Sequence, residues 1–365
     1  MSFAEFLGNP RVVTVLRGML FNDRVPNAML FTGPRGVGKY TLARMFAQAA
    51  NCERLRDDFC GECDPCRKIG LLADPAALIQ QGLAERGESA DSSVVERVPL
   101  ILQTHPDVWA IVPDPVRLKT PVVRPVIHVD QLRAVQRAAY FRPQGRRRVF
   151  ILDGAETMRW DLANIFLKIL EEPPESATLI LLAPSPYALL PTIVSRCFQF
   201  YFAPLATAQI EAALERKTQL APKGRQLAAQ MSEGSLGLAL GMDVDRNLEV
   251  RREALRLLEL AVAGKTSLLF AQTGALAKKQ DTPFESVLEM LSSLLNDLFE
   301  LTTSPADAVL RNLALQKELR ALSEKVNSEW VRRAVAGVDL LYSRMRRNIN
   351  RQLSLDALGV SLAVK

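Results

Sequence analysis

The chain has 365 residues, of which 48% are apolar and 24% charged, with a formal net charge of +6. This composition is that of a globular protein with two or three domains, and the charge excess is too small to indicate nucleic-acid binding by itself. No apolar run reaches the roughly 18 residues of a membrane-spanning helix, and the opening MSFAEFLGNP lacks the pattern of a signal peptide. We therefore expect a cytoplasmic protein, in which the five cysteines do not form a disulfide scaffold.

Residues 1–203 predict an α/β domain. Short apolar runs alternate with helical patterns, which indicates a mostly parallel sheet covered by helices on both faces. The helical patterns are Tyr40–Ala50, Val129–Tyr140 and Leu162–Glu171. The predicted strands, in β-branched or apolar runs, are Ala28–Thr32, Asp107–Ile111, Val149–Leu152, Thr178–Leu182 and Phe198–Phe202. Residues 67–104 read as an insertion rich in acidic and small polar residues, for which we expect either a partly flexible segment or a short helix with a loop.

Strand patterns stop after residue 203. Residues 204–243 predict a small helical domain with breaks at Pro222–Gly224 and at Gly234–Ser235. Residues 246–365 repeat apolar residues at three- and four-residue spacing, and such amphipathic helices are expected to pack as a bundle. The predicted helices of this bundle are Val250–Val262, Phe284–Leu301, Ala306–Val326 and Trp330–Arg346.

The clearest motif is the glycine-rich loop GPRGVGK, which follows the first predicted strand and precedes a helix, as a phosphate-binding P-loop requires. Its glycines allow a tight turn whose backbone N–H groups converge on phosphate oxygens, and the helix presents its N-terminus to the same anion. The lysine adds a positive charge. We expect ATP or ADP to be held by Gly33, Pro34, Arg35, Gly36, Val37, Gly38 and Lys39.

The residue after this lysine departs from the P-loop pattern. A Ser or Thr hydroxyl normally ligates Mg²⁺ there, whereas this chain has Tyr40, with Thr41 one position further. A phenol hydroxyl lies a ring's length from the backbone, and Thr41 is rotated by about 100° around the helix. Tyr40 and Thr41 are candidate nucleotide contacts, but the pattern argues against ordinary Mg²⁺ coordination.

A second acidic motif follows the run Val149–Leu152. Asp153 ends this run as the acid of a Walker B strand does, and it can hold Mg²⁺ through water. Hydrolysing P-loop enzymes of this kind place a glutamate next, which orients the attacking water, but this chain has Gly154. Glu156 is interpreted as a loop charge, so weak or no hydrolysis is predicted. Just before the strand, Arg146–Arg148 are predicted to be a solvated loop end, with contact to DNA phosphates as the alternative.

Four of the five cysteines form a C-x7-C-x2-C-x2-C pattern. Four thiolates at this spacing can close a tetrahedral Zn²⁺ site with no open position, so the predicted site is structural. Free thiols on a loop and an iron–sulfur cluster are the alternatives. The predicted zinc ligands are Cys52, Cys60, Cys63 and Cys66.

Together these residues resemble the clamp-loader branch of the AAA+ family. The run LEEPP at Leu170–Pro174 is similar to a helix end of that family, Ser195–Cys197 to its SRC motif, and the cysteine pattern to the zinc module of bacterial loader subunits. The tail RNINRQLSL from Arg347 resembles the end of a collar domain. The resemblance implies an AAA+ domain at residues 1–203 with a zinc module at 52–66, a helical lid domain at 204–243 and an all-α collar domain, used for oligomerisation, at 246–365.

In that family the subunits form a five-membered ring with ATP at the interfaces, and the SRC arginine reaches the γ-phosphate held by a neighbour. The resemblance implies that Arg196 is an arginine finger acting in trans, whereas an arginine paired with an acid at a helix end is the alternative. The family's polar sensor-1 residue corresponds to Ser185, a candidate nucleotide contact. Its sensor-2 arginine is replaced here by Gly237.

Three departures, at Tyr40, Gly154 and Gly237, thus fall in one nucleotide site. They resemble the delta-prime class of clamp-loader subunit and imply a part of the DNA polymerase III holoenzyme, a DNA-directed DNA polymerase, with weak or no ATPase of its own. The implied cofactor is structural Zn²⁺. The implied partners are the gamma/tau and delta subunits, the sliding clamp and, through the complex, primer–template DNA. A gamma/tau-type ATPase motor and a zinc-bearing nucleic-acid-binding protein are the alternative functions.

Overall fold

The computed structural model describes residues 2–86, 98–114, 125–158, 163–172, 174–279, 282–345 and 349–363. The chain divides into two compact units, Met1–Leu205 and Ala206–Lys365. Part of the predicted insertion and the start of the collar-like tail lie outside the described residues. None of the described helices is long and apolar enough to cross a membrane.

The first unit is built on one six-stranded sheet. Its order is β2-β3-β4-β5-β1-β6, and every neighbouring pair is parallel except β2 with β3. All five predicted strands are confirmed, while β2 was missed because it lies within the stretch interpreted as an insertion. The strands are β1 (Ala28–Thr32), β2 (Ile101–His105), β3 (Val108–Ile111), β4 (Arg148–Asp153), β5 (Ala177–Ala183) and β6 (Phe198–Tyr201).

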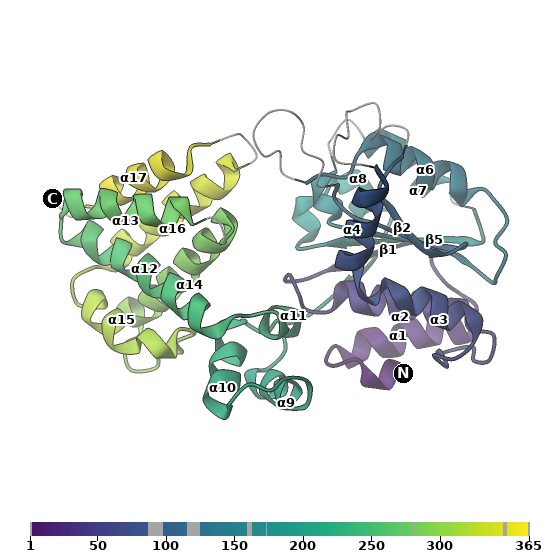
Figure 1. The fold of residues 1–365 in the computed structure, drawn as a ribbon, viewed down its shortest axis with the longest axis horizontal. Helices are drawn as coiled ribbons and strands as arrows, with labels where there is room; N and C mark the ends of the chain where they lie inside the picture. The colour runs from purple at the N-terminus through teal and green to yellow at the C-terminus, as the bar shows by residue number, and fades with distance from the viewer. Residues whose placement is uncertain are drawn as a thin grey trace. The chain divides into compact units, whose positions relative to one another are not determined.

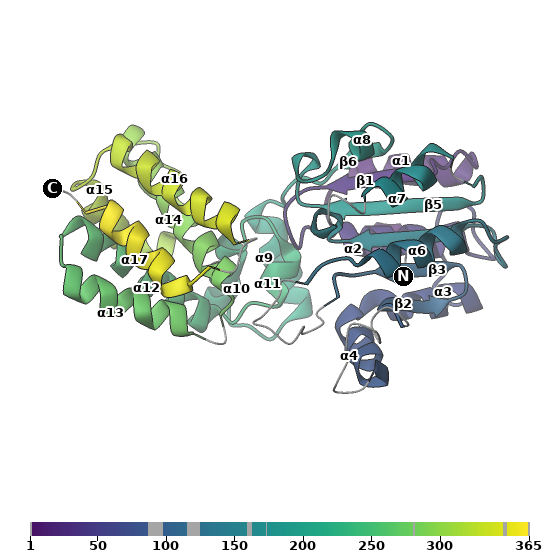
Figure 2. The ribbon, with the colours of Figure 1, turned by 90° about the horizontal axis from the view of Figure 1, so that it is seen from above.

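Helices cover both faces of this sheet (Figure 1). Side chains alternate along a strand, so Met29 and Phe31 of β1 pack under α1, α2 and α3, while Leu30 packs under α6, α7 and α8. The turned view shows the same layers from above (Figure 2). The helices are α1 (Pro10–Phe21), α2 (Lys39–Ala50), α3 (Asp64–Gly70), α4 (Pro75–Arg86), α6 (Val129–Ala139), α7 (Ala163–Glu171) and α8 (Pro191–Val194). Short 3-10 helices are η1 (Phe3–Glu5), η2 (Leu71–Ala73), η3 (Ala155–Thr157) and η5 (Pro186–Ala188).

Of the three consecutive arginines, Arg146 is exposed, as predicted for a solvated loop end, but the prediction is wrong for the partly buried Arg147 and for Arg148, which is buried and begins β4. Arg148 is 8% exposed and its guanidinium pairs with the buried carboxylate of Asp107 at 3.1 Å. Arg147 donates to the hydroxyl of Thr178 at 3.2 Å. Arg146 donates to backbone carbonyls at the end of α2 and in the following loop, because carbonyls at a helix end lack partners within the helix. All three are used inside the unit, which leaves the DNA-phosphate alternative without support.

The second unit is all helical, as predicted. A break separates α9 from α10, but it lies at residues 218–221, just before the predicted Pro222–Gly224, because Pro222 is the first residue of α10, the helix position where proline is favoured. The predicted helix Ala306–Val326 is also too long, because only Leu313–Ser323 is helical. The helices are α9 (Thr207–Lys217), α10 (Pro222–Met231), α11 (Leu236–Leu240), α12 (Val244–Val262), α13 (Thr266–Lys278), α14 (Phe284–Thr303), η6 (Leu313–Leu315), α15 (Gln316–Ser323), α16 (Ser328–Arg344) and α17 (Arg351–Ser361).

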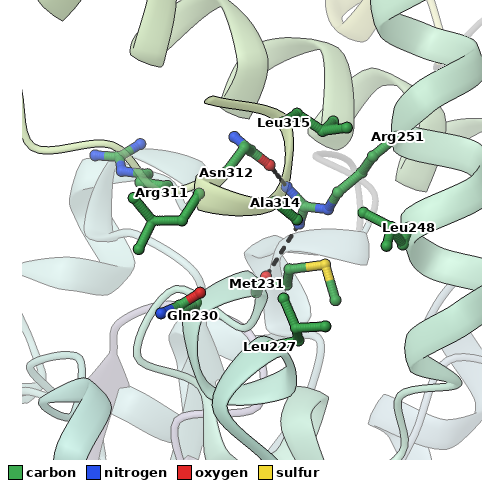
Figure 3. Close-up of a pocket in the computed structure, with 10 residues that line it drawn as sticks. Leu227, Gln230, Met231, Leu248, Arg251, Arg311, Asn312, Ala314 and Leu315 are labelled. Atoms are coloured by element: carbon green, nitrogen blue, oxygen red, sulfur yellow. Dashed lines mark hydrogen bonds between the residues drawn. The ribbon is translucent and has the colours of Figure 1, made fainter. Parts of the chain in front are cut away.

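A buried arginine joins helices α9–α11 to helices α12–α17 in this second unit (Figure 3). Arg251 of α12 is 5% exposed and donates to the carbonyl of Met231, at the end of α10, at 3.0 Å. Its guanidinium also donates to the side chains of Asn312 and Ser293. Ser293 in turn donates to the Glu233 carboxylate at 2.6 Å. The cavity beside this cluster measures about 10 Å³, which is room for a single water at most.

Candidate functional site

The glycine-rich loop has the backbone shape of a phosphate cradle. Gly33, Gly36 and Gly38 have φ values of 146°, 74° and 101°, in the region that disfavours side chains. A Cβ at Gly33 would lie 2.4 Å from the carbonyl oxygen of Phe202, and one at Gly38 would lie 3.0 Å from the ring of Phe6. These two glycines are therefore required by their surroundings as well as by their φ angles.

Lys39 closes this loop on itself. Its Nζ donates to the carbonyl oxygens of Gly33 at 2.6 Å and Pro34 at 2.7 Å. Burial lowers the Lys39 pKa, and the carboxylates of Asp153 and Glu156 oppose that shift. A phosphate bound at the loop would replace these two carbonyl oxygens as the hydrogen-bond acceptor of the Lys39 ammonium group.

Asp153 lies at the end of β4, close enough to the loop to interact electrostatically with Lys39 and Tyr40. Burial raises the pKa of this carboxyl, while Lys39, a backbone hydrogen bond from Gly154 and Arg35 lower it. The structure therefore brings together the P-loop and the predicted Walker B acid. Sequence reasoning placed both correctly from the apolar strands that precede them.

Tyr40 uses its hydroxyl in a hydrogen bond within the chain. Its Oη donates to the carbonyl oxygen of Leu72, in η2, at 3.0 Å, and burial raises the pKa of the phenol. Thr41 is exposed on α2. The phenol is thus engaged in a contact with the segment after the cysteine module, which the sequence could not reveal because it is specific to the folded chain.

Gly154 follows Asp153 directly, at the position where a glutamate is expected from the sequence of a hydrolysing enzyme. Its φ is 71°, and a Cβ there would lie 2.9 Å from Cγ of Pro113. The backbone of this chain is therefore shaped for glycine at that point. The next acid, Glu156, lies in η3 after the strand.

Arg196 lies at the other end of the sheet from the P-loop. β6 pairs in parallel with β1, and Phe198 is level with Met29, so Arg196 lies beyond the amino end of β1 while the P-loop follows its carboxyl end. The five residues of β1 separate the two levels by about 16 Å. Arg196 is half-exposed, pairs with the Glu171 carboxylate at 2.8 Å and donates to the Thr192 carbonyl at 2.9 Å.

The two sensor positions are placed as follows. The Ser185 side chain caps η5 by accepting a hydrogen bond from the backbone N–H of Tyr187 at 3.3 Å. Gly237 lies in α11 of the second unit, after Ser235, whose side chain accepts a hydrogen bond from the Leu238 N–H at 3.2 Å. A nucleotide contact by Ser185 stays a prediction.

The four predicted zinc ligands meet at one point. The sulfur atoms of Cys52, Cys60, Cys63 and Cys66 all lie within 4.8 Å of one another. Tetrahedral coordination at about 2.3 Å per Zn–S bond requires S–S separations of about 3.8 Å, which lie below this limit, so the donor set fits Zn²⁺. Among the described residues, these four cysteines form the group whose sulfur atoms lie close enough to hold one metal ion. Zn²⁺ bound there would join the loop after α2 to the start of α3.

The thiols also differ in ways that suit a metal. The Sγ of Cys60 accepts hydrogen bonds from the backbone N–H groups of Cys63 at 3.3 Å and Glu62 at 3.5 Å. These bonds lower the pKa of Cys60 to about 6, so its thiolate forms readily. Burial raises the pKa of Cys66, and a buried thiolate there requires a compensating cation.

Two site residues were missed at the level of sequence. Phe6 lies against Gly38 at the P-loop, and Glu171 holds the guanidinium of Arg196. Glu171 belongs to the LEEPP run, so the motif that carried the family resemblance contained the signal. Phe6 is far from the loop in sequence and gave none.

Comparisons with known proteins agree on one family. A family model described as DNA polymerase III, delta subunit, matches residues 8–206. DNA polymerase III subunit tau of Escherichia coli (strain K12) is 32% identical over 249 residues, 66% of this chain and 32% of that protein. DNA polymerase III subunit delta' of Bacillus subtilis (strain 168) is 26% identical over 362 residues, 97% of this chain and 95% of that protein.

Coverage differs between these relatives. The chain spans only 32%, 48% and 55% of the length of three curated tau subunits that it matches. Among solved structures, a gamma subunit-related protein from Thermotoga maritima aligns with 96% of this chain and 98% of its own, at 15% identity and a TM-score of 0.46.

Proposed function

The chain belongs to the DNA polymerase III delta-subunit family as a clamp-loader subunit of the delta-prime type, and from this we propose how it acts. It takes its place in a five-membered ring with gamma/tau and delta subunits. That complex opens the sliding clamp and loads it on primer–template DNA. Residues 246–365 supply the contacts of the ring as a collar, and residues 204–243 form the lid.

The contribution of this chain to ATP hydrolysis is Arg196, directed at the nucleotide of a neighbouring subunit. The observation that carries this proposal is its place at the amino end of β1, opposite its own P-loop. A guanidinium there cannot serve the phosphate cradle of the same chain. Its permanent charge and planar fork suit a phosphate contact, and arginine fingers of this kind accelerate hydrolysis by about 10³–10⁵.

The chain's own P-loop holds ATP or ADP passively. Supporting this, Gly154 stands in place of the water-orienting glutamate, Tyr40 is engaged with Leu72 instead of a metal, and no arginine occupies the position of Gly237. The four cysteines hold structural Zn²⁺, for which metal analysis of the purified chain is expected to give about one ion.

Arg196→Ala tests the trans role. In the reconstituted loader, we expect DNA-stimulated ATP hydrolysis at the neighbouring site to be lost, with assembly unchanged in size-exclusion chromatography. Arg133→Ala is the matched control, because Arg133 is also exposed and paired with an acid, Asp130 at 3.7 Å. Normal turnover by the Arg196→Ala loader would rule out the assignment.

A gamma/tau-type motor is the second candidate, favoured by the 32% identity to a tau subunit. It requires hydrolysis by the isolated chain. ATP turnover that depends on Lys39, absent in Lys39→Ala, and that matches active loader motors would establish this alternative. Turnover at the background level in both forms supports the passive nucleotide site.

A further inference from the structure

A polar stripe runs along the P-loop helix from the phosphate cradle to the cysteine cluster. Tyr40, Arg44, Gln48 and Cys52 follow one another at four-residue spacing, which places them along one side of α2. Tyr40 directly follows the P-loop lysine, and Cys52 is the first predicted zinc ligand. The two sites are therefore the two ends of a single helix and its cap.

Each polar member of the stripe is bonded to the cysteine module or to its neighbour. The Gln48 side chain is 3% exposed, and its Nε2 donates to the carbonyl oxygen of Cys66 at 2.8 Å. Its Oε1 accepts from Arg44, 7% exposed, at 2.8 Å. The Tyr40 hydroxyl donates to the Leu72 carbonyl at 3.0 Å. A Cβ at Gly70 would lie 3.4 Å from Gln48 Nε2, so α3 packs closely over this side chain.

These hydrogen bonds connect the segment from Cys66 to Leu72 with the P-loop helix α2. Cys66 is one of the four proposed thiolate ligands and lies in α3, and Leu72 lies in η2, which directly follows α3. Tyr40 belongs to the first turn of α2, whose backbone N–H groups form one wall of the phosphate cradle. Unpaired buried carbonyls are costly, so the stripe favours one position of the module relative to the loop.

From this geometry we propose that Tyr40 and Gln48 are positioning residues that couple the zinc centre to the P-loop. Metal binding at the four cysteines orders the phosphate cradle through α2, and the ordered cradle retains the metal in return, as linkage requires. Tyr40 then has a structural role: its phenol, which cannot ligate Mg²⁺ in the usual way, bonds to the segment that follows the zinc module. The inference rests on the zinc centre proposed above and is independent of Arg196.

The test uses the purified full-length chain with zinc bound. A chromophoric chelator measures the rate of zinc removal, and hydrogen exchange reports the order of the loop Gly33–Thr41 before and after removal. Tyr40→Phe and Gln48→Met are made singly and together. Tyr187→Phe and Gln81→Met are matched controls, because Tyr187 is 96% exposed and Gln81 is exposed on α4.

We expect Tyr40→Phe, which removes only a hydroxyl, to speed zinc removal about three- to tenfold, the effect of one hydrogen bond to a buried carbonyl. Zinc removal should increase exchange in the loop of the native chain and of the controls, and change it little in the double variant. Unchanged loop exchange in the native chain, or an equal increase in the double variant, would overturn the coupling. A native chain that takes up no zinc would refute the zinc centre itself, and this inference with it, while leaving the role of Arg196 intact.

Discussion

Gly154 directly follows Asp153, at the position where the clamp-loader resemblance places a water-orienting glutamate. The strand before it delivers Asp153 to the P-loop as in a hydrolysing relative, but the chain then turns with a φ of 71°. Left-handed backbone costs about 1–2 kcal/mol for a residue with a side chain, and Pro113 lies where the side chain would begin. The loss of the glutamate is thus built into the backbone and is not a simple side-chain exchange.

Gly154→Glu is therefore expected to lower the free energy of unfolding by about 2 kcal/mol, from backbone strain and the clash, without creating ATP hydrolysis. Urea unfolding and ATP turnover of the isolated chain measure the two effects. Gly264→Glu separates strain from clash, since Gly264 has a φ of 64° and no atom within 4 Å of its Cβ position. In Gly18→Glu, neither the backbone strain nor the clash is expected. Restored hydrolysis at undiminished stability would contradict this account.

The ion pair between Arg196 and Glu171 leads to a second prediction. Both side chains are partly exposed, at 37% and 51%, so the pair is worth at most about 1 kcal/mol. In the proposed trans role of Arg196, Glu171 would compete with the neighbour's phosphate for the same guanidinium. Glu171→Gln should leave stability within about 0.5 kcal/mol and raise ATP turnover of the reconstituted loader by up to about fivefold. Glu172→Gln is the control, and lower turnover in Glu171→Gln alone would mean that the carboxylate orients the finger instead.

At the scale of elements, the sequence predicted those with strong local patterns and missed those that depend on distant partners. The strand of the P-loop was predicted to the residue, because four of the five residues Ala28–Thr32 are apolar and the run leads directly into the glycine-rich loop. β2 was missed, since its burial depends on pairing with β3. The predicted helix Ala306–Val326 begins too early because the Asp297 side chain of α14 accepts the backbone N–H groups of Arg311 and Asn312 and holds them out of a helix.

The end of β2 carries a pH-sensitive contact. His105 is 7% exposed, its Nδ1 accepts the backbone N–H of Asp107 at 3.1 Å, and burial lowers its pKa. As pH falls through about 6.5, the unfolded chain binds this proton before the folded one, so stability is lost by up to about 1.4 kcal/mol per pH unit.

His105→Gln removes this titration. We expect the difference in unfolding free energy between the native chain and this variant to be constant above pH 7 and to shrink as the pH is lowered to 5.5. Urea unfolding of both forms at several pH values measures this difference. A difference that stays constant over the whole range would show that His105 does not titrate in this way.

At the scale of the whole molecule, the predicted site divides into what local chemistry specifies and what only the fold can provide. The P-loop and the cysteine cluster were predictable because their residues lie at fixed spacing in sequence, and the Walker B acid was predictable because it ends an apolar strand. The engagement of Tyr40 with Leu72, the contact of Phe6 with Gly38 and the pairing of Glu171 with Arg196 join segments far apart in sequence. No periodicity or spacing encodes such contacts.

Each unit also has a core of its own, and in the second unit Arg251 joins the two helical groups that the resemblance assigns to lid and collar. Arg251→Met keeps the apolar stem but leaves the Met231 carbonyl and the Asn312 amide oxygen without their donor. We expect the unfolding free energy of this unit to fall by about 3 kcal/mol, measured by hydrogen exchange of peptides from residues 206–363 in increasing urea. Arg252→Met is the control, because the side chain of Arg252, next to Arg251 in sequence, is exposed. Its replacement should shift the unfolding free energy by less than about 0.5 kcal/mol. Equal stability of the two variants would mean that the helices alone, and not this buried guanidinium, hold the two groups together.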